Sequence, residues 1–322
     1  MRPLVGLLTT CDRTLRTRAM DTQSALLAHL ADRAGRSVPV SRTLVRAWEM
    51  SGVQRIGFAH GPDLIFKWAR EPFTGEADVL WNLLVQGVPV PEVFASVVRD
   101  GVLGMLMEDL GEPVRSATVE DAVTAALRVH AAKPVDGLPV VDRAVLAALP
   151  GRALDRLAEL RAAGRWTDTG GLDDPLMALA DHADRLSAGA ELAPYGLCHS
   201  EFHPTSLHVG ADGWRLLDWA RAFVGPGLLD LASWQGTQEA ADPASLRRLI
   251  RDYVRAGGPV ETERPRAGVL AEEWALGWHR LWITVWYLDQ SVVWMPDPAR
   301  DVFAASVVGR HVEEARRLLW AP

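Results

Sequence analysis

The chain contains 322 residues, of which 48% are hydrophobic and 23% are charged, and its formal net charge is −7. This composition is ordinary for a globular protein, and a negative net charge without any basic run argues against nucleic-acid binding. The length predicts two domains or lobes rather than one compact core.

Cysteine usage and hydropathy favour a cytoplasmic location. The two cysteines, Cys11 and Cys198, lie far apart and form no disulfide framework, which is typical of a reducing compartment. No apolar run reaches the roughly 18 residues that a membrane-spanning helix needs. The segment Met1–Thr10 is mildly apolar, but no small-residue cleavage site follows it. We therefore expect no membrane segment.

The first third of the chain predicts a helix followed by an antiparallel sheet. The helix is expected over residues 21–36, where Gly35 is its stop signal and its apolar face consists of Leu26, Leu27 and Leu30. Three short apolar segments follow, at residues 38–48, 53–59 and 64–68, and are typical of strands joined by tight turns. After a helix that begins at Glu76, two more strands are expected at residues 92–98 and 103–107, joined by a hairpin turn.

Two features of this sheet are ambiguous. Lys67 ends an apolar strand, so it is either an edge lysine or a phosphate-pairing lysine whose partner is Glu76, at the start of the next helix. Ser51 and Gly52 are expected in the first turn. Gly52 would serve there as a turn residue or would let the backbone approach a nucleotide phosphate.

Beyond residue 111 the pattern changes from strands to helices, which predicts a domain boundary. We expect an N-terminal helical extension over residues 1–36, a small lobe over 37–111 and a larger lobe over 112–322. Apolar periodicity places the helices of the larger lobe at residues 119–132, 143–148, 152–163, 175–189, 228–238, 243–256, 271–294 and from 298 to the C-terminus.

A polar stretch from His199 to Ser206 interrupts these helices. The apolar runs 207–209 and 214–217 flank an Ala-Asp-Gly turn, so a hairpin should bring Glu201, before its first arm, close to Asp218, after its second. Converging carboxylates indicate a metal–phosphate site or an acid–base pair. Zinc-protease, zinc-deaminase and serine-hydrolase motifs are absent from the sequence, while a purely structural loop stays open.

The stretch resembles the aminoglycoside phosphotransferase family, whose catalytic loop H-G-D-x-x-x-x-N precedes a metal-binding I-D-W. This chain has H-S-E-x-x-x-x-S and then Leu217-Asp218-Trp219. Supporting motifs occur in the family's order at Lys67, Glu76, 106–111, 127–131, Gly225-Pro226 and 229–232. The resemblance implies an α+β, two-lobed protein-kinase-like fold with a small antiparallel-sheet N-lobe and a mainly helical C-lobe.

The same resemblance implies phosphoryl transfer from ATP, or another NTP, to a hydroxyl group with Mg²⁺. Its carried-over roles are Glu201 as base and His199 as a further catalytic-loop residue, Asp218 as metal ligand and Ser206 as a weak second ligand, with Asp230 as structural support. The residues expected at the nucleotide are Lys67, Glu76, Ser51, Gly52, Glu108 and Leu110.

Three positions depart from the family pattern. Glu201 stands in place of Asp and Ser206 in place of Asn, while Ser200 replaces Gly, which predicts that φ is not positive there. The alternative function is therefore a pseudokinase that binds nucleotide or a partner protein without transfer.

The acceptor is not fixed by these motifs. A small antibiotic-like alcohol and a Ser or Thr of a precursor peptide, with a lyase as partner protein, both stay open. A stripe of four tryptophans covers about 120° of one helix, and is either helix–helix core or an acceptor or partner surface; it consists of Trp274, Trp278, Trp282 and Trp286.

Overall fold

The computed structural model describes residues 23–320. The first 22 residues, with Met1–Thr10, Cys11 and the start of the expected first helix, lie outside the described residues. The chain divides into two compact units. One takes in the chain up to Trp81 together with Pro91–Gly111, and the other takes in Asn82–Val90 and the chain from Glu112 onward.

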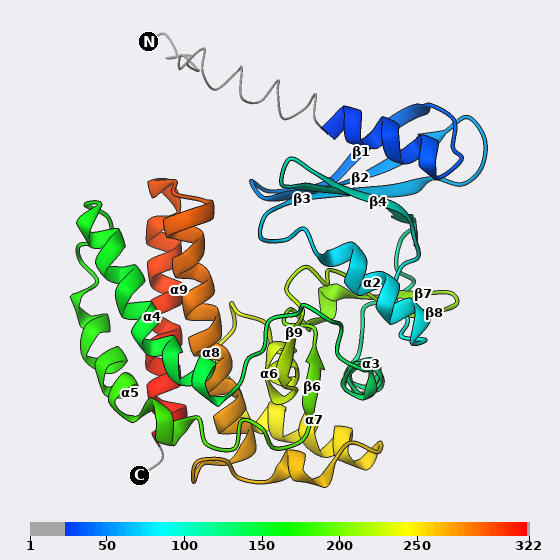
Figure 1. Ribbon diagram of the computed structural model, residues 1–322. Coiled ribbons are helices and arrows are strands. Elements are labelled where there is room, and N and C mark those ends of the chain that lie inside the picture. Colours follow the sequence, from blue (N-terminus) through cyan, green and yellow to red (C-terminus); the bar gives the residue numbers. More distant parts are fainter. Residues whose placement is uncertain (1–22, 321–322) are drawn as a thin grey trace, which may run out of the picture. The chain divides into compact units, whose positions relative to one another are not determined.

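The first unit is an antiparallel sheet with two helices (Figure 1). Its strand order is β1-β2-β3-β5-β4, so β5 pairs with β3 and β4 lies at the edge of the sheet. After a helix at residues 23–33, the elements are β1 (Pro39–Ala47), β2 (Ser51–Phe58), β3 (Leu64–Arg70), α2 (Glu76–Val85), β4 (Val93–Arg99) and β5 (Val102–Glu108). The five expected strands are all present.

One apolar core joins the first helix to the sheet. Leu26, Leu27 and Leu30 are buried with Ile56 and Phe66, as the helical spacing predicts. Gly35, with φ of 64°, follows the end of this helix. The β4–β5 turn, at Asp100-Gly101, has positive φ at both residues, which is the geometry of a type I′ hairpin turn.

The expected turn at Ser51-Gly52 is wrong, since both residues begin strand β2. Gly52 pairs with Trp68 of β3, and a Cβ atom on Gly52 would lie 2.5 Å from the Trp68 indole nitrogen. The glycine is therefore required by this close approach of a tryptophan. The Ser51 hydroxyl accepts a hydrogen bond from the indole of Trp48, and the turn lies between these two residues.

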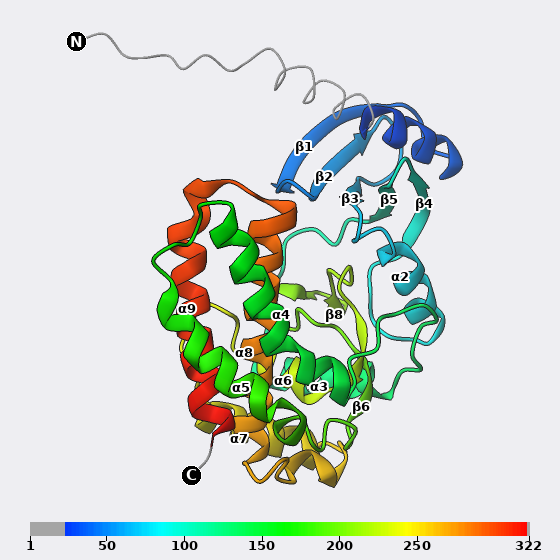
Figure 2. The ribbon, with the colours of Figure 1, turned by 60° about the vertical axis from the view of Figure 1, so that its left-hand side comes forward.

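The second unit is mainly helical (Figure 2). Helices α4, α5, α8 and α9 lie side by side, the strand pair β6–β9 lies beside α6, and β7–β8 is a separate two-stranded sheet. The elements are α3 (Val119–Ala131), α4 (Arg143–Ala162), α5 (Asp173–Leu186), β6 (Tyr195–Cys198), β7 (Leu207–Gly210), β8 (Gly213–Leu216), β9 (Phe223–Pro226), α6 (Leu228–Ser233), α7 (Pro243–Arg255), α8 (Ala271–Asp289), a π-helical turn η4 (Gln290–Trp294) and α9 (Asp301–Leu319).

Two expected helix boundaries are wrong. The break expected between residues 148 and 152 is absent, because α4 continues through Pro150. Proline inside a helix costs about 3 kcal/mol, and burial of leucines on both sides of it offsets that cost, since each contributes about 1.5–3 kcal/mol. These buried residues are Leu146, Leu149, Leu157 and Leu160.

The second error concerns α6, which ends at Ser233 rather than at Gln238. Gly236 has a φ of 74°, which breaks the helical pattern, and the backbone carbonyls that follow are bound by side chains of α8 and α9. The segment from Trp234 to Ala241 is therefore an ordered loop, called the α6–α7 loop below.

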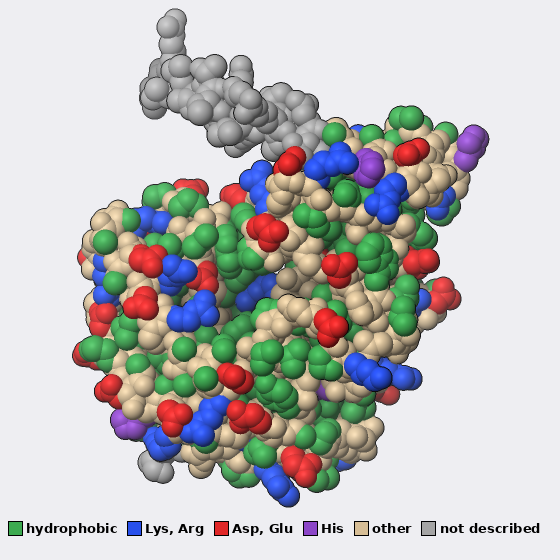
Figure 3. All heavy atoms as spheres, viewed as in Figure 1, with side chains coloured by type: hydrophobic (Ala, Val, Ile, Leu, Met, Phe, Trp, Pro, Cys, Tyr) green, Lys and Arg blue, Asp and Glu red, His purple; other side chains and the backbone are tan. Residues whose placement is uncertain are grey.

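No helix among residues 23–320 is long and apolar enough to cross a membrane. On the face shown in Figure 3, lysine and arginine side chains are interspersed with aspartate and glutamate.

Candidate functional site

A buried ion pair occupies the centre of the sheet unit. Lys67 lies on β3 and is 5% exposed, and its Nζ is 2.7 Å from Oε1 and 2.6 Å from Oε2 of Glu76. Glu76 begins α2 and is 1% exposed. A buried lysine in the middle of a sheet is not the exposed edge lysine that the sequence left open. The arrangement holds the ammonium group in a fixed position, as a phosphate-pairing lysine requires.

The end of β5 continues into a segment with two residues expected at the nucleotide, Glu108 and Leu110. The Glu108 amide donates to the Glu92 carbonyl at 2.8 Å, which fixes the strand end. Asp109 accepts from Arg55 at 2.6 Å and from the Gly111 amide at 2.9 Å, and Leu110 between them is half-buried. This segment is thus ordered by its own side chains.

Asp230 fixes the start of the polar loop. Its carboxylate, fully buried in α6, accepts the amide of His199 at 2.6 Å and the amide of Ser200 at 2.8 Å. Two such bonds to one ionised group are strong because the acceptor is charged. His130 Nε2 lies 3.6 Å from the same carboxylate.

His199 connects the two carboxylate positions predicted from the hairpin. Its Nε2 donates to the carbonyl of Leu217 at 2.7 Å, directly before Asp218. Burial lowers the pKa of His199, against the opposing effect of Asp230, so the ring is the neutral Nε2-H tautomer at pH 7. His199 therefore links the segment that carries Glu201 to the segment that carries Asp218 by a hydrogen bond.

The backbone adopts a left-handed conformation in both of these segments, at the residue after His199 and at the residue after Leu217. Ser200 has a φ of 77° and Asp218 a φ of 71°. The prediction that Ser200 avoids positive φ is wrong, because the bond from its amide to Asp230 holds the backbone in this region. Such strain costs about 1–3 kcal/mol and is frequent at functional sites.

Replacing Ser200 by glycine should therefore raise the free energy of unfolding by about 1 kcal/mol. Glycine removes the strain, and it also removes a buried hydroxyl that has no hydrogen-bond partner among the described residues. Chemical denaturation measures the change. Ser187→Gly is the control and should destabilise, because Ser187 has a φ of −81° and its hydroxyl is bonded to Asp184. A less stable Ser200→Gly variant would contradict the strain.

Asp218 and Ser206 fit a magnesium ion unequally. Asp218 offers a carboxylate, which is a preferred ligand of this ion. Ser206 is buried, its hydroxyl faces the ring of His203 with Oγ 3.2 Å from Nδ1, and its carbonyl accepts the Leu217 amide at 2.8 Å. The hydroxyl is thus shared with a histidine, so Asp218 would be the stronger of the two ligands predicted for a metal ion.

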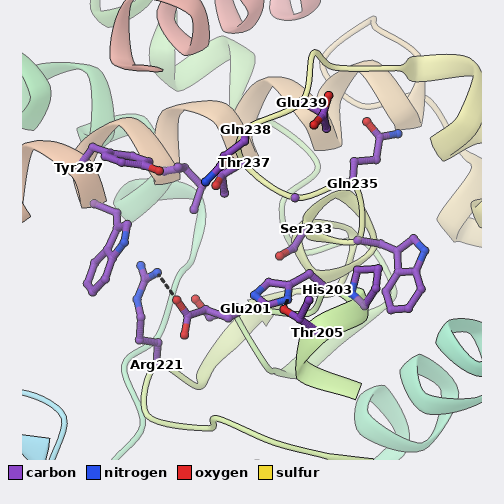
Figure 4. A pocket seen from close by; sticks show the side chains of 16 residues that line it. Glu201, His203, Thr205, Arg221, Ser233, Gln235, Thr237, Gln238, Glu239 and Tyr287 are labelled. Carbon is purple, nitrogen blue, oxygen red and sulfur yellow. Dashed lines mark hydrogen bonds and ion pairs between the residues drawn. The ribbon is translucent and has the colours of Figure 1, made fainter. Parts of the chain in front are cut away.

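Glu201 lines a pocket of about 390 Å³ within the helical unit (Figure 4). Arg221, which the sequence reading missed, lies on the same wall, and its Nη1 is 3.5 Å from Oε1 of Glu201. The Arg221 side chain is 11% exposed, and its guanidinium stacks 3.6 Å from the ring centre of Trp286. Both Glu201 and Asp218 act electrostatically on this arginine.

The tryptophan stripe divides into two halves. Trp274 and Trp278 are fully buried, and both indoles donate to the carbonyl of Leu186, so they belong to the helix core. Trp282 packs against Phe223, with ring centres 5.4 Å apart. Trp286 lines the pocket and also contacts Trp294 of the π-helical turn at 4.7 Å. Only the C-terminal end of the stripe therefore reaches the site.

The α6–α7 loop forms another wall of the pocket, and side chains of α8 and α9 bind its backbone carbonyls. Arg280 donates to the carbonyls of Gly236 and Glu239, and His311 to the carbonyl of Thr237 at 2.8 Å. The buried pair Arg280–Glu314, at 2.7 Å, completes this support, and Glu314 also accepts the Ala241 amide.

The neutral His311 makes this support sensitive to acid. Burial and the nearby Arg280 and Arg310 lower its pKa to about 3. A histidine with a folded-state pKa below its unfolded value of about 6.5 contributes stability above that value, and the contribution is lost as pH falls toward 3. We expect the free energy of unfolding to fall between pH 6.5 and 5 in the native chain. His311→Gln should flatten this dependence, whereas the exposed His60→Gln should not; identical profiles would contradict the assignment.

Comparisons with known proteins agree with this geometry. The model of the phosphotransferase enzyme family matches residues 65–268, well over half of the chain. The comparison with curated proteins finds no match.

Three solved structures illustrate the similarity of fold. A thermostable mutant of an aminoglycoside phosphotransferase is 15% identical with a TM-score of 0.59, covering 90% of this chain and 98% of that one. A macrolide 2′-phosphotransferase from Brachybacterium faecium is 18% identical with a TM-score of 0.57, covering 88% and 97%. An amicoumacin kinase in complex with AMP-PNP and Ca²⁺ is 13% identical with a TM-score of 0.55, covering 93% and 96%. The predicted kinase-like fold and the resemblance to aminoglycoside phosphotransferases are confirmed, and the chain belongs to the phosphotransferase enzyme family.

Proposed function

We propose that this chain transfers the γ-phosphoryl group of ATP to a hydroxyl group of a small molecule. The observation that supports this most strongly is the placement of Glu201 on the wall of a pocket, next to a largely buried arginine. A concave pocket of this volume is typical of small-molecule sites. The precursor-peptide acceptor and the lyase partner have no separate support and stay predictions.

In this proposal, each charged group has one task. Glu201 orients the acceptor hydroxyl and takes its proton as the oxygen attacks the γ-phosphorus, the bond to the β-phosphate bridging oxygen breaks, and ADP leaves. Asp218, with Ser206 as a weaker ligand, would hold Mg²⁺, which when bound neutralises phosphate charge. Lys67, held by Glu76, would pair with the phosphates.

The backbone of Glu108 and Leu110 would hold the adenine ring, and strand β2 at Ser51 and Gly52 would lie along the nucleotide. Asp230 and His199 keep the loop in its strained conformation.

Thermal unfolding with ATP, with and without Mg²⁺, tests the proposal together with ADP formation in the presence of acceptors. We expect stabilisation that increases with Mg²⁺ and acceptor-dependent release of ADP. Lys67→Met should abolish the thermal shift with ATP. The absence of a shift in either condition would overturn nucleotide binding. A metal-independent shift without ADP formation would favour the pseudokinase.

A further inference from the structure

The charge of the pocket wall restricts what the acceptor can be. The pocket has a volume of about 390 Å³. Three charged residues other than histidine line it, Glu201, Arg221 and Glu239. Glu239 is exposed to solvent, so its charge is screened, and the other two residues, Glu201 and Arg221, form an ion pair.

This pair is held in place, and its two charges are opposite. The Arg221 guanidinium is stacked on Trp286 at 3.6 Å and cannot swing away without losing that contact. An arginine stays protonated at neutral pH. Glu201 therefore has its counter-charge inside the protein, and a cationic acceptor would have to approach a fixed positive charge to reach it.

Two carboxylates of α8 lie outside the pocket lining and have arginine partners of their own. Asp289 is bound by Arg156 at 2.8 Å and by Arg152 at 3.4 Å. Glu272 is bound by Arg247. Neither carboxylate lines the described pocket. A ligand with several ammonium groups would find no matching set of acceptors here, and electrostatic complementarity would be poor.

The remaining groups on the wall are uncharged. Hydroxyl and amide side chains converge on the pocket in Figure 4, and the carbonyls of the α6–α7 loop at Gly236, Thr237 and Glu239 are already bonded to α8 and α9. The loop therefore presents side chains rather than backbone to the ligand. The neutral polar lining includes Thr205, Ser233, Thr237, Gln238 and Tyr287, with Trp234 and Trp286 as aromatic surfaces.

We propose that the acceptor is an uncharged, hydroxyl-rich molecule such as a neutral glycoside, and that Arg221 excludes polycationic acceptors. This inference rests on the proposed function, because Glu201 belongs to both. Neutral hydroxyl and amide groups recognise sugar hydroxyls through hydrogen bonds, while aromatic faces cover the apolar parts of the ring.

The test measures kcat/KM from ADP release over a panel of hydroxyl-bearing compounds matched in size: uncharged glycosides such as maltotriose, glucuronides, and polycations such as kanamycin A. We expect the best uncharged compound to exceed the best polycation and the best anion at least tenfold. A polycation or an anion in first place would overturn the charge assignment and leave phosphoryl transfer standing. If the chain binds ATP and Mg²⁺ but releases no ADP with any class of compound, both the proposed phosphoryl transfer and the proposed acceptor class would be overturned.

A single substitution sharpens the test. Arg221→Met keeps an unbranched apolar side chain at this position but removes the guanidinium, and it leaves the charge of Glu201 uncompensated. The measured quantity is kcat/KM for kanamycin A divided by kcat/KM for the best uncharged compound, because this ratio cancels any general loss of rate. We expect it to rise at least tenfold in the variant. Arg247→Met, which removes a paired arginine away from the pocket, is the matched control. An unchanged ratio in Arg221→Met would contradict the role of this residue.

Discussion

Replacing Asp230 by alanine is expected to lower the free energy of unfolding by about 3–5 kcal/mol and to abolish activity. The substitution leaves the amides of His199 and Ser200 buried without an acceptor, and each unsatisfied group costs about 1–3 kcal/mol. The strained backbone of Ser200 also loses the bond that holds it, so Glu201, the next residue, leaves its position.

Chemical denaturation and ADP release measure the two effects separately. Asp230→Asn keeps one carbonyl oxygen as acceptor and should lose about half as much stability while staying folded, which allows its activity to be measured. Asp184→Ala is the control, because that carboxylate is 87% exposed and surface ion pairs contribute little. A loss below 1 kcal/mol in Asp230→Ala would show that the loop is held by other contacts.

The sequence predicted the elements that depend on local signals. The five strands follow from apolar segments separated by turn residues, and the β7–β8 hairpin follows from two apolar runs around Ala211-Asp212-Gly213. The kinase-like fold could be inferred because the motifs occur in the family's order. These features depend on neighbours within a few residues or on the order of short segments, which a single sequence contains.

The errors have distant causes. α6 ends at Ser233 because Arg280, Arg310 and His311, more than 40 residues away, bind the carbonyls of the next segment. Periodicity does not reveal such contacts. Gly52 was expected in a turn, but glycine is required there because the indole of Trp68 on the paired strand leaves no room for a side chain.

The sequence named Glu201 and Asp218 as candidate site residues but not Arg221. Arg221 follows Asp218 by three residues, and its importance depends on a stacking contact with Trp286 from a helix 65 residues later in the chain. The tryptophan stripe was recognised as one face of a helix, but a helix that passes from the core to a pocket gives its residues different roles. Whether a tryptophan of the stripe belongs to the core or to a binding surface depends on its surroundings, which the sequence alone does not give.

Replacing Glu201 by glutamine is expected to lower kcat by about 10²–10⁴-fold, the usual contribution of a positioned general base. Glutamine keeps the length of the side chain but cannot take the proton of the acceptor hydroxyl. ATP binding, measured by thermal shift, should be unchanged, because the groups proposed to hold the nucleotide and its metal ion are Lys67 and Asp218. Glu263→Gln, an exposed carboxylate outside the pocket, is the control and should keep its rate.

The length of the side chain at position 201 gives a second, more specific result. Glu201→Asp restores the family's residue but withdraws the carboxylate by one methylene from Arg221, which now lies 3.5 Å away. If the pocket is built around glutamate, aspartate should lower kcat about tenfold, since catalytic groups are held to within about 0.5 Å. The loss should be smaller than with glutamine, because aspartate still accepts a proton. A glutamine variant that retains more than a tenth of the rate would show that Glu201 is not the base, and the pocket would then bind the acceptor without activating it.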